Sequence, residues 1–293
     1  QKQPIAVIQG NVSLKDKHDI QNFEVNEKRY LELTKPFEES NTLIIWPETV
    51  IQKWIPVFVG SVENDPRLPN LKKPSSLLIG TLTAQYPDKM YNSAMAIYGD
   101  GEIPLPYHKR ILMPFGEYIP GYTIFPKLIE FGEMVGVATF TAGEKESVFD
   151  YPMKNSFGDY NLKVSPLICY EDIVPSLSRE SVNSGAELLV NLTNDAWFGD
   201  SVAPFQHHLI ASFRSIENRR YLIRSTNTGY TAVVNPIGET VSYLPSFKEG
   251  TLITDVGILK DKTIYTRLLG EKMWLFVSIF SLLIGIVRRY RST

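Results

Sequence analysis

The sequence has only one cysteine and four histidines among its 293 residues. A single cysteine excludes an intrachain disulfide, and there is neither a cysteine cluster nor a zinc-type spacing of histidines. The Gly-x-Ser-x-Gly elbow of serine hydrolases and the Walker-type phosphate loop are also missing. We therefore expect neither a metal nor a cofactor.

An excess of positive charge is lacking as well. The 30 lysines and arginines are balanced by 32 aspartates and glutamates, for a net charge of −2. Proteins that bind nucleic acid usually carry a strongly basic face, so no nucleic-acid partner is expected. Repeats and low-complexity segments are absent, and a hydrophobic content of 43% is ample for a sizeable core. The length suits one large α/β domain or two small ones.

The start of the chain has neither a signal peptide nor a methionine. Residues 1–4 lead directly into an apolar stretch that reads as a strand. This beginning indicates that the chain is cut from something longer.

The chain has one long hydrophobic run, the 15 uncharged residues from Met273 to Val287. A full membrane span usually needs about 17–25 residues, but snorkelling of flanking basic residues can make up the difference. Lys272 precedes the run, and Arg288, Arg289 and Arg291 follow it. We predict a transmembrane helix whose C-terminus is cytoplasmic, with the large domain on the opposite side. The alternative is a buried C-terminal core helix.

Apolar periodicity predicts how the rest of the chain is organised. Strands are expected at 4–9, 43–46, 77–83, 93–98, 162–168, 188–192, 221–225, 231–235, 240–243 and 251–256, and helices at 24–39, 175–184 and 204–219. The last helix is expected to turn Phe205, Leu209, Phe213 and Ile216 inward. Residues 51–75 are rich in proline and read as loop. Strands and helices alternate early in the chain and hairpins appear later, a pattern that suits two sheets covered by helices. We expect this domain to span residues 1–258, followed by a linker at 259–272 and the terminal segment 273–293.

Cys169 follows the apolar run Leu162–Ile168 and precedes a polar, acidic turn. A strand that delivers a side chain to its own C-terminal end is how many enzymes present a nucleophile. A lone cysteine is more commonly a small buried hydrophobe, so this position alone does not decide between the two. A pairing with His207 or His208 is conceivable, but their place on a predicted helix favours surface exposure.

Two other segments carry chemistry. Glu48 follows a short apolar strand that Pro47 is expected to end, and a carboxylate at a strand tip can have its pKa raised towards the range of a general base. Lys109 lies in a Tyr-His-Lys segment, where its compact cation could hold an oxyanion. The plain alternatives are a surface turn for Glu48 and a solvated lysine for Lys109.

The order of Glu48, Lys109 and Cys169 resembles the Glu-Lys-Cys triad of the carbon–nitrogen hydrolase (nitrilase) superfamily. The flanking sequence is similar to its apolipoprotein N-acyltransferase branch, in the stretches Trp46–Thr49, Pro114–Pro120, Cys169–Glu171, Asn194–Gly199 and Arg224–Ala232. The resemblance covers residues 4 to about 256. It implies an α-β-β-α sandwich.

The resemblance also implies roles. Glu48 would be the general base, Lys109 the oxyanion stabiliser and Cys169 the nucleophile, with Glu117, Tyr170 and Glu171 in supporting positions. The activity would move an acyl chain from a phospholipid, through a thioester on the cysteine, to the N-terminal amine of a diacylglyceryl apolipoprotein. The setting would be the bacterial inner membrane, with the catalytic domain on the periplasmic side.

Two departures from the family stand out. The multi-helix membrane domain that precedes this domain in the family is not in this sequence, and the tryptophan expected shortly after Gln9-Gly10-Asn11 is absent. Two other functions stay open: a nitrilase-type amidase that uses water as acceptor, and a membrane-tethered binding domain with an inactive site. The loop 114–142 mixes aromatic residues with glycine and proline, which fits either a subsidiary hydrophobic cluster or an apolar lid that dips into lipid.

Overall fold

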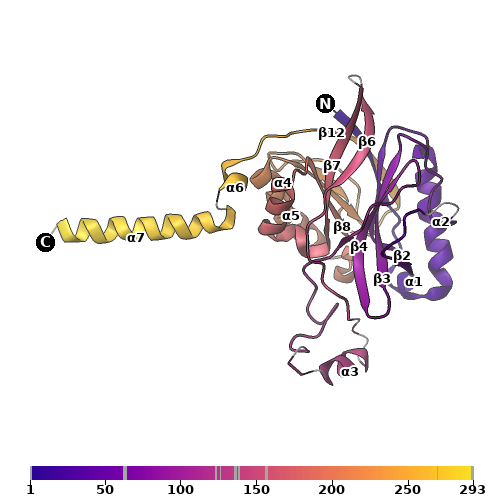
Figure 1. Ribbon diagram of the computed structural model, residues 1–293, viewed down its shortest axis with the longest axis horizontal. Helices are drawn as coiled ribbons and strands as arrows, with labels where there is room; N and C mark the ends of the chain where they lie inside the picture. Colours follow the sequence, from indigo (N-terminus) through magenta and orange to yellow (C-terminus); the bar gives the residue numbers. More distant parts are fainter. Residues whose placement is uncertain are drawn as a thin grey trace.

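The computed structural model describes residues 2–61, 65–122, 124–125, 127–134, 137, 139–155, 158–268 and 270–291. Two six-stranded sheets stack face to face and carry helices on their outer sides (Figure 1). The predicted α-β-β-α sandwich is therefore confirmed. Five positions of the predicted loop 114–142, and the last two residues of the predicted terminal segment, lie outside the described residues.

The first sheet has the strand order β12-β1-β2-β3-β4-β5. Strand β2 runs parallel to both β1 and β3, and the remaining neighbours pair antiparallel. The strands are β1 (Lys2–Gln9), β2 (Leu43–Pro56), β3 (Ser76–Gln85), β4 (Lys89–Tyr98), β5 (Tyr107–His108) and β12 (Gly250–Gly257).

The second sheet has the order β11-β10-β9-β8-β7-β6, with β7, β8 and β9 parallel. Its strands are β6 (Phe149–Asn155), β7 (Gly158–Ile168), β8 (Leu188–Thr193), β9 (Tyr221–Thr226), β10 (Ala232–Val234) and β11 (Thr240–Tyr243). The helices and helical turns are α1 (Leu14–His18), η1 (Ile20–Asn22), α2 (Phe23–Thr34), η2 (Lys35–Phe37), α3 (Lys127–Met134), η3 (Cys169–Ile173), α4 (Pro175–Asn183), η4 (Asp195–Phe198), α5 (Ala203–Asn218), α6 (Ile264–Arg267), η5 (Gly270–Lys272) and α7 (Met273–Arg291).

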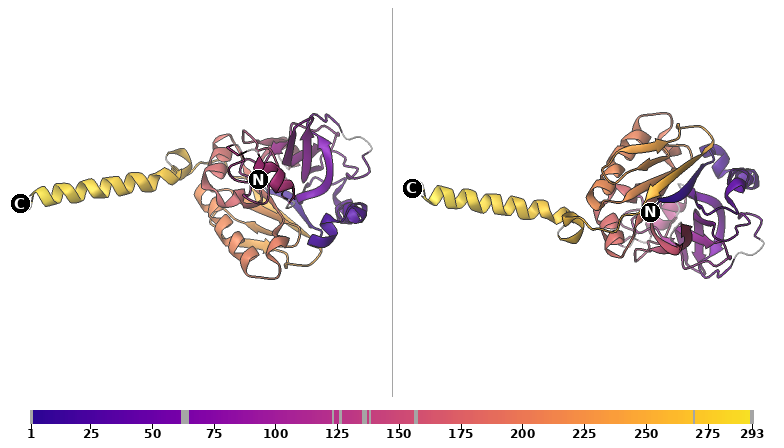
Figure 2. Two further views of the ribbon diagram at one scale, coloured as in Figure 1. Left: turned by 90° about the horizontal axis from the view of Figure 1, so that it is seen from below. Right: turned by 90° about the horizontal axis from the view of Figure 1, so that it is seen from above.

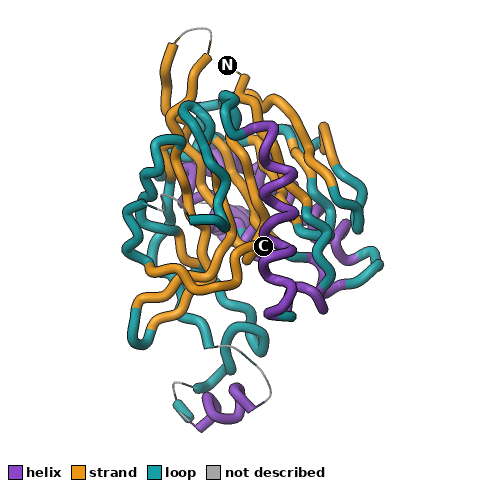
Figure 3. Tube along the Cα trace, turned by 90° about the vertical axis from the view of Figure 1, so that its right-hand side faces the viewer, coloured by secondary structure: helices purple, strands orange, loops and turns teal. Residues whose placement is uncertain are grey.

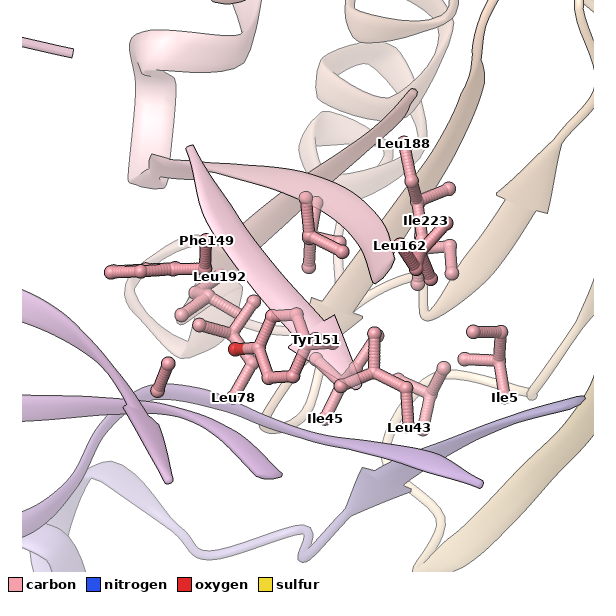
Figure 4. Packing of buried hydrophobic residues seen from close by; sticks show 14 of the residues in the cluster. Ile5, Leu43, Ile45, Leu78, Phe149, Tyr151, Leu162, Leu188, Leu192 and Ile223 are labelled. Atoms are coloured by element: carbon pink, nitrogen blue, oxygen red, sulfur yellow. The ribbon is translucent and has the colours of Figure 1, made fainter. Parts of the chain in front are cut away.

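Successive side chains of a strand point to opposite faces of the sheet, so the apolar residues of one strand contribute to two different cores. In β2, Leu43 and Ile45 join the core between the sheets, whereas Ile44 and Trp46 join the core beneath α2. Figure 4 shows the first of these cores, in which the two β2 side chains belong to the same cluster as Tyr151 and Leu192 of the second sheet. A third, smaller core lies under α4 and α5. Because both faces of the central strands are covered, these strands read as unbroken apolar runs.

Strand β2 is longer than predicted, and Pro47 does not end it. The pairing with β3 is interrupted between Trp46 and Ile51, where Thr49 has a φ of 49°. The proline therefore interrupts the ladder of hydrogen bonds while the strand continues as far as Pro56. Residues 51–56 belong to this strand, so the predicted loop 51–75 is wrong in its first part.

Strand β6 was not predicted, and it contains Pro152, a residue that is rare inside sheets. It lies at the edge of the second sheet, where a missing backbone N–H is tolerated. Its partner β7 begins at Gly158, four residues earlier than the predicted strand.

The predicted orientation of α5 is wrong. Phe205, Leu209, Phe213 and Ile216 are between 46% and 56% exposed. The buried face is largely polar, and its side chains have partners: His207 contacts two aspartates and Asn218 donates to Ser178. Periodicity finds the apolar stripe of a helix but not the direction in which it points.

The C-terminal helix α7 leads away from the sandwich (Figures 1 and 2). Its apolar side chains, from Trp274 to Val287, are exposed, so the alternative of a buried core helix is wrong. None of the described helices combines the length and the apolarity needed to cross a membrane. The predicted transmembrane helix is therefore not confirmed.

The described part of the loop 114–142 projects from one end of the sandwich and contains α3 (Figure 3). Phe115, Ile124, Phe125 and Met134 are exposed, whereas Ile119 is buried. Tyr118, Tyr122, Leu128 and Phe140 are half-buried, so the described part of this loop combines packed and exposed apolar side chains.

The orientation of α5 can be tested with a matched pair of substitutions. Ile216→Gln, on the outer face, is expected to change the free energy of unfolding by less than about 1 kcal/mol. Ala211→Gln, at a fully buried position of the same helix, is expected to cost more than about 2 kcal/mol, because it overfills the small core and buries an amide. Urea unfolding measures both, and a larger loss for the Ile216 variant would contradict the orientation.

Candidate active site

Cys169 lies where β7 ends and the helical turn η3 begins, as predicted from the sequence. Its φ is 55°, a region that residues other than glycine rarely adopt. The carbonyl oxygen of Cys169 accepts a hydrogen bond from the Asn191 side chain at 2.7 Å. The half-buried Cys169 packs against the core between the sheets, and the hydrogen bond from Asn191 holds its backbone in this turn.

Glu48 is buried inside β2, at the interruption of the β2–β3 pairing, so the alternative of a surface turn is wrong. A side chain at Gly80 of β3 would lie only 2.4 Å from the carbonyl oxygen of Pro47, so this glycine permits the backbone at Glu48 to approach. One carboxylate oxygen accepts a 2.7 Å hydrogen bond from Asn92. The Glu48 backbone carbonyl accepts another from Lys17 at 2.9 Å.

Lys109 follows β5 directly and is 2% exposed, so the alternative of a solvated lysine is wrong. Its Nζ lies 2.8 Å from Oε2 of Glu117 and 3.9 Å from Oε1 of Glu48. The Tyr170 ring centroid is 5.5 Å from the same ammonium. Two backbone hydrogen bonds of 2.8 Å, to Asn92 and from Gly143, hold the lysine in place.

Asn92 joins the two carboxylates, although it was not among the predicted site residues. Its side-chain nitrogen donates to Glu48 at 2.7 Å and to Glu117 at 3.0 Å. Glu117 also accepts from the backbone N–H of Met113 at 2.8 Å. The available signal was the polar Asn92-Ser93 pair at the start of the predicted strand 93–98; both residues are buried in β4.

Glu171 is fully buried and accepts four hydrogen bonds. The donors are the Tyr107 hydroxyl and the backbone N–H groups of Arg110, Ile111 and Ile168, at 2.7–3.1 Å. This carboxylate therefore ties the segment around Lys109 to the turn that carries Cys169. The neighbouring Tyr170 adds a 2.8 Å bond from its hydroxyl to the carbonyl oxygen of Leu112.

The electrostatics of the site keep the thiol protonated. Burial, reinforced by the Glu48 carboxylate, raises the pKa of Cys169 to about 12, although Lys109 opposes this shift. Burial also raises the pKa of Glu48, against the lowering effect of Lys109. For Lys109, burial lowers the pKa, but Glu48, Cys169 and Glu117 outweigh it and the net pKa is raised. A charged ammonium, carboxylates and a neutral thiol thus share one site.

His207 and His208 are buried on the inner face of α5, so the expected surface exposure is wrong. His207 bridges Asp172 and Asp195 at 2.8 and 3.0 Å. Burial lowers the pKa of His207, but its hydrogen bonds to these aspartates outweigh it and raise the pKa to about 9. Across the described residues, no group of three or more histidine, cysteine, aspartate or glutamate side chains is arranged to hold a metal ion.

The predicted site residues thus come together from separate segments. Lys109 contacts Glu48 and Glu117, Tyr170 lies beside Lys109, and the pKa of Cys169 responds to both Glu48 and Lys109. The profile of the carbon–nitrogen hydrolase family matches residues 5–258. The chain belongs to the carbon–nitrogen hydrolase family.

Curated relatives of this chain include the apolipoprotein N-acyltransferases of Shewanella oneidensis and Haemophilus ducreyi. The first is 30% identical over 98% of this chain and 55% of its own length. The second is 31% identical over 99% of this chain and 57% of its own length. The chain thus spans about half the length of the curated relatives it matches.

Solved structures with the same fold include Nit3 of Saccharomyces cerevisiae, a member of the nitrilase superfamily. It has a TM-score of 0.56 and 20% identity, covering 87% of this chain and 90% of its own. An amidase from Nesterenkonia sp. AN1, with acrylamide added to its active-site cysteine, has a TM-score of 0.55 and 19% identity, covering 87% of this chain and 93% of its own. The two TM-scores show that the chain shares a nitrilase-like fold with these proteins.

The four hydrogen bonds at Glu171 predict that this carboxylate cannot be replaced by its amide. In Glu171→Gln an N–H₂ group replaces one acceptor and faces two donors, which should cost about 2–4 kcal/mol of unfolding free energy. Glu180→Gln is the control, because Glu180 pairs with Arg110 at the surface and its loss should cost less than about 1 kcal/mol. Chemical denaturation measures both variants, and equally small decreases in their free energies of unfolding would contradict this role of Glu171.

Proposed function

We propose that this chain carries the catalytic machinery of an apolipoprotein N-acyltransferase, with Cys169 as nucleophile, Glu48 as general base and Lys109 as oxyanion stabiliser. The observation that carries the proposal is the convergence of these groups: the ammonium of Lys109 lies 3.9 Å from Glu48, and both act on the pKa of the same thiol. Relatives that bear this name match nearly the whole chain, which supports lipoprotein N-acylation as the activity.

The reaction has two halves. Glu48 takes the proton of Cys169 as the sulfur attacks the carbonyl carbon of an ester, because a thiol with a pKa of about 12 is a poor nucleophile without a base. The carbon–oxygen bond then breaks, Glu48 returns the proton to the leaving alcohol, and a thioester remains on Cys169. In the second half an amine attacks the thioester and Glu48 receives its proton. The carbon–sulfur bond then breaks, and Glu48 passes this proton to the sulfur, which restores the thiol and the free carboxylate.

The oxyanion formed in each half needs positive charge nearby. Lys109 supplies it, together with the backbone N–H of Tyr170, which already faces the sulfur and lowers the pKa of Cys169. Glu117 and Asn92 hold Lys109 and Glu48 in place. Glu171 fixes the position of the Lys109 segment against the cysteine turn. In this proposal these side chains act by restricting the geometry of the reacting groups.

The substrates in this proposal are a phospholipid acyl donor and the α-amino group of a diacylglyceryl-cysteine apolipoprotein. The names of the relatives and the absence of a metal or cofactor requirement in thioester chemistry are consistent with this pair. The proposal also includes a preceding membrane domain, because the chain spans about half the length of these relatives. That domain would bring lipid to the site.

A location at the bacterial inner membrane is part of the same proposal, with the catalytic domain periplasmic and the C-terminus cytoplasmic. Exposed apolar side chains on α7, and Phe125 and Met134 at the projecting loop, favour contact with lipid. Arg288 and Arg289 follow the apolar part of α7, as expected on the cytoplasmic side. The loop 114–142 would act as the apolar lid, and α7 as a transmembrane helix stays a prediction.

Mass spectrometry of the intact protein tests the reaction class. After incubation with phospholipid in detergent micelles, we expect one added acyl mass, absent in Cys169→Ser, that disappears when a diacylglyceryl-cysteine peptide is supplied. A soluble p-nitrophenyl ester provides a second donor that needs no membrane domain. Rapid hydrolysis of small amides without transfer to an amine would favour the amidase, and no acylation by either donor would favour an inactive binding domain.

A further inference from the structure

A second buried lysine lies beside Glu48, the proposed general base, and has no role in the proposed reaction. Lys17 is 7% exposed, and its Nζ donates a 2.9 Å hydrogen bond to the backbone carbonyl oxygen of Glu48. We propose that Lys17 is a positioning residue whose charge keeps the Glu48 carboxylate ionised and ready to accept the Cys169 proton. This inference rests on the proposed function, because it assigns Glu48 the role of base.

The chain holds Lys17 in place from both sides. It lies on the single turn α1, where the Ser13 side chain caps the helix by accepting from the Asp16 N–H at 3.1 Å. The segment before the turn is fixed by Asn227, whose side chain bonds both the N–H and the carbonyl of Val12 at 2.9 and 2.7 Å. On the other side, Asn26 of α2 donates to the Asp16 carbonyl at 3.1 Å.

Burial of this ammonium needs an electrostatic reason. Lysine is almost never buried unless it is paired, because removing the charge from water is costly. The hydrogen bond of Lys17 goes to a neutral carbonyl, which compensates only part of that cost. The charges that favour its protonated form are Glu48 first and Cys169 second. The lysine is therefore held against the active-site charges rather than in a separate ion pair.

The charge balance of the site shows why a second cation matters. Two carboxylates, Glu48 and Glu117, face Lys109, but the ammonium lies 2.8 Å from Glu117 and 3.9 Å from Glu48. Lys109 is thus engaged mainly by Glu117, and the Glu117 charge itself raises the pKa of Glu48. With Lys17 included, two ammonium groups balance two carboxylates. Without it, Glu48 would hold its proton more tightly.

The effect of Lys17 should appear in the acid limb of the pH–rate profile, where Glu48 becomes protonated. Burial lowers the pKa of Lys17 to about 8, so the side chain is charged throughout the range in which a buried glutamate titrates. The charged and polar groups that face Glu48 are Lys17 from α1, Lys109 after β5, Glu117, Asn92 of β4 and Cys169. Removal of Lys17 deletes one of the two cations that lower the pKa of Glu48, so this pKa must rise.

Alkylation of the single cysteine tests this directly, because its readout does not depend on the natural substrate. The second-order rate of reaction with acrylamide, a neutral electrophile, is measured by intact mass from pH 4.5 to 9. In Lys17→Met the acid limb of the rate profile should move to higher pH by about one unit, which lowers the rate about tenfold on that limb. The rate on the plateau should change by less than threefold.

Three further variants separate charge from structure. Lys17→Gln keeps a donor for the Glu48 carbonyl without the charge and should show the same shift as Lys17→Met. Lys17→Arg keeps the charge and should restore the wild-type limb. Lys15→Met, at an exposed position of the same turn, should leave the profile unchanged. If Lys17→Met does not fold, as judged by circular dichroism, the Gln and Arg pair carries the test.

The outcomes distinguish this inference from the proposed function. A uniform loss of rate at every pH in the Lys17 variants, or no change in any of them, would overturn the electrostatic role. Glu48→Gln reports on the reaction itself, and its acid limb should be abolished. If Glu48→Gln has the same profile as the wild type, the general-base assignment fails and the Lys17 proposal fails with it.

Discussion

The ammonium of Lys109 lies between two carboxylates in a part of the protein from which water is largely excluded. Moving such charges out of water costs several kcal/mol for each ion, and their attraction repays this only when hydrogen bonds complete the arrangement. Asn92, the Met113 N–H and the Gly143 and Asn92 backbones supply those bonds. Burial and the Glu48 charge also raise the pKa of the Cys169 thiol, which is why the proposed mechanism needs a base.

The sandwich makes this burial possible because the two sheets contribute different halves of the site. Glu48 and Lys109 belong to the first sheet and its β5 extension, while Cys169 leaves the end of β7 in the second. The halves are joined by Glu171, which is carried on the cysteine turn but accepts from the Lys109 segment. Alignment of the proposed nucleophile, Cys169, with the proposed base, Glu48, therefore depends on the packing between the sheets as well as on local turns.

The sequence was informative wherever local chemistry determines structure. The apolar runs before Glu48 and Cys169 correctly indicated central strands, because strands buried on both faces leave a continuous apolar pattern. The position of Cys169 at a strand end follows from that pattern. Glu117 and Glu171 were found through a resemblance and not through any property of their own segments, since only the folded chain reveals how many donors each carboxylate meets.

Other features depended on contacts that are distant in sequence. The apolar stripe of α5 was identified but placed on the wrong side, because the polar face finds buried partners such as Asp172 only after folding. Pro47 was expected to end a strand, but the strand continues through an irregular pairing that Gly80 of β3 permits. Lys17 and Asn92 escaped notice because a single lysine or asparagine has no local pattern. Their roles depend on which side chains come to lie beside them.

The central claim is that Cys169 rests as a neutral thiol in a buried, charge-balanced site and becomes a nucleophile only through Glu48. Thiolate absorbance near 240 nm tests it most directly, because the chain has a single cysteine and the Cys169→Ser protein supplies the blank. Between pH 5 and 8 the difference spectrum should show no thiolate, consistent with burial and Glu48 raising the pKa of Cys169 to about 12. A full thiolate band at pH 7 would mean a preformed ion pair and would contradict the account.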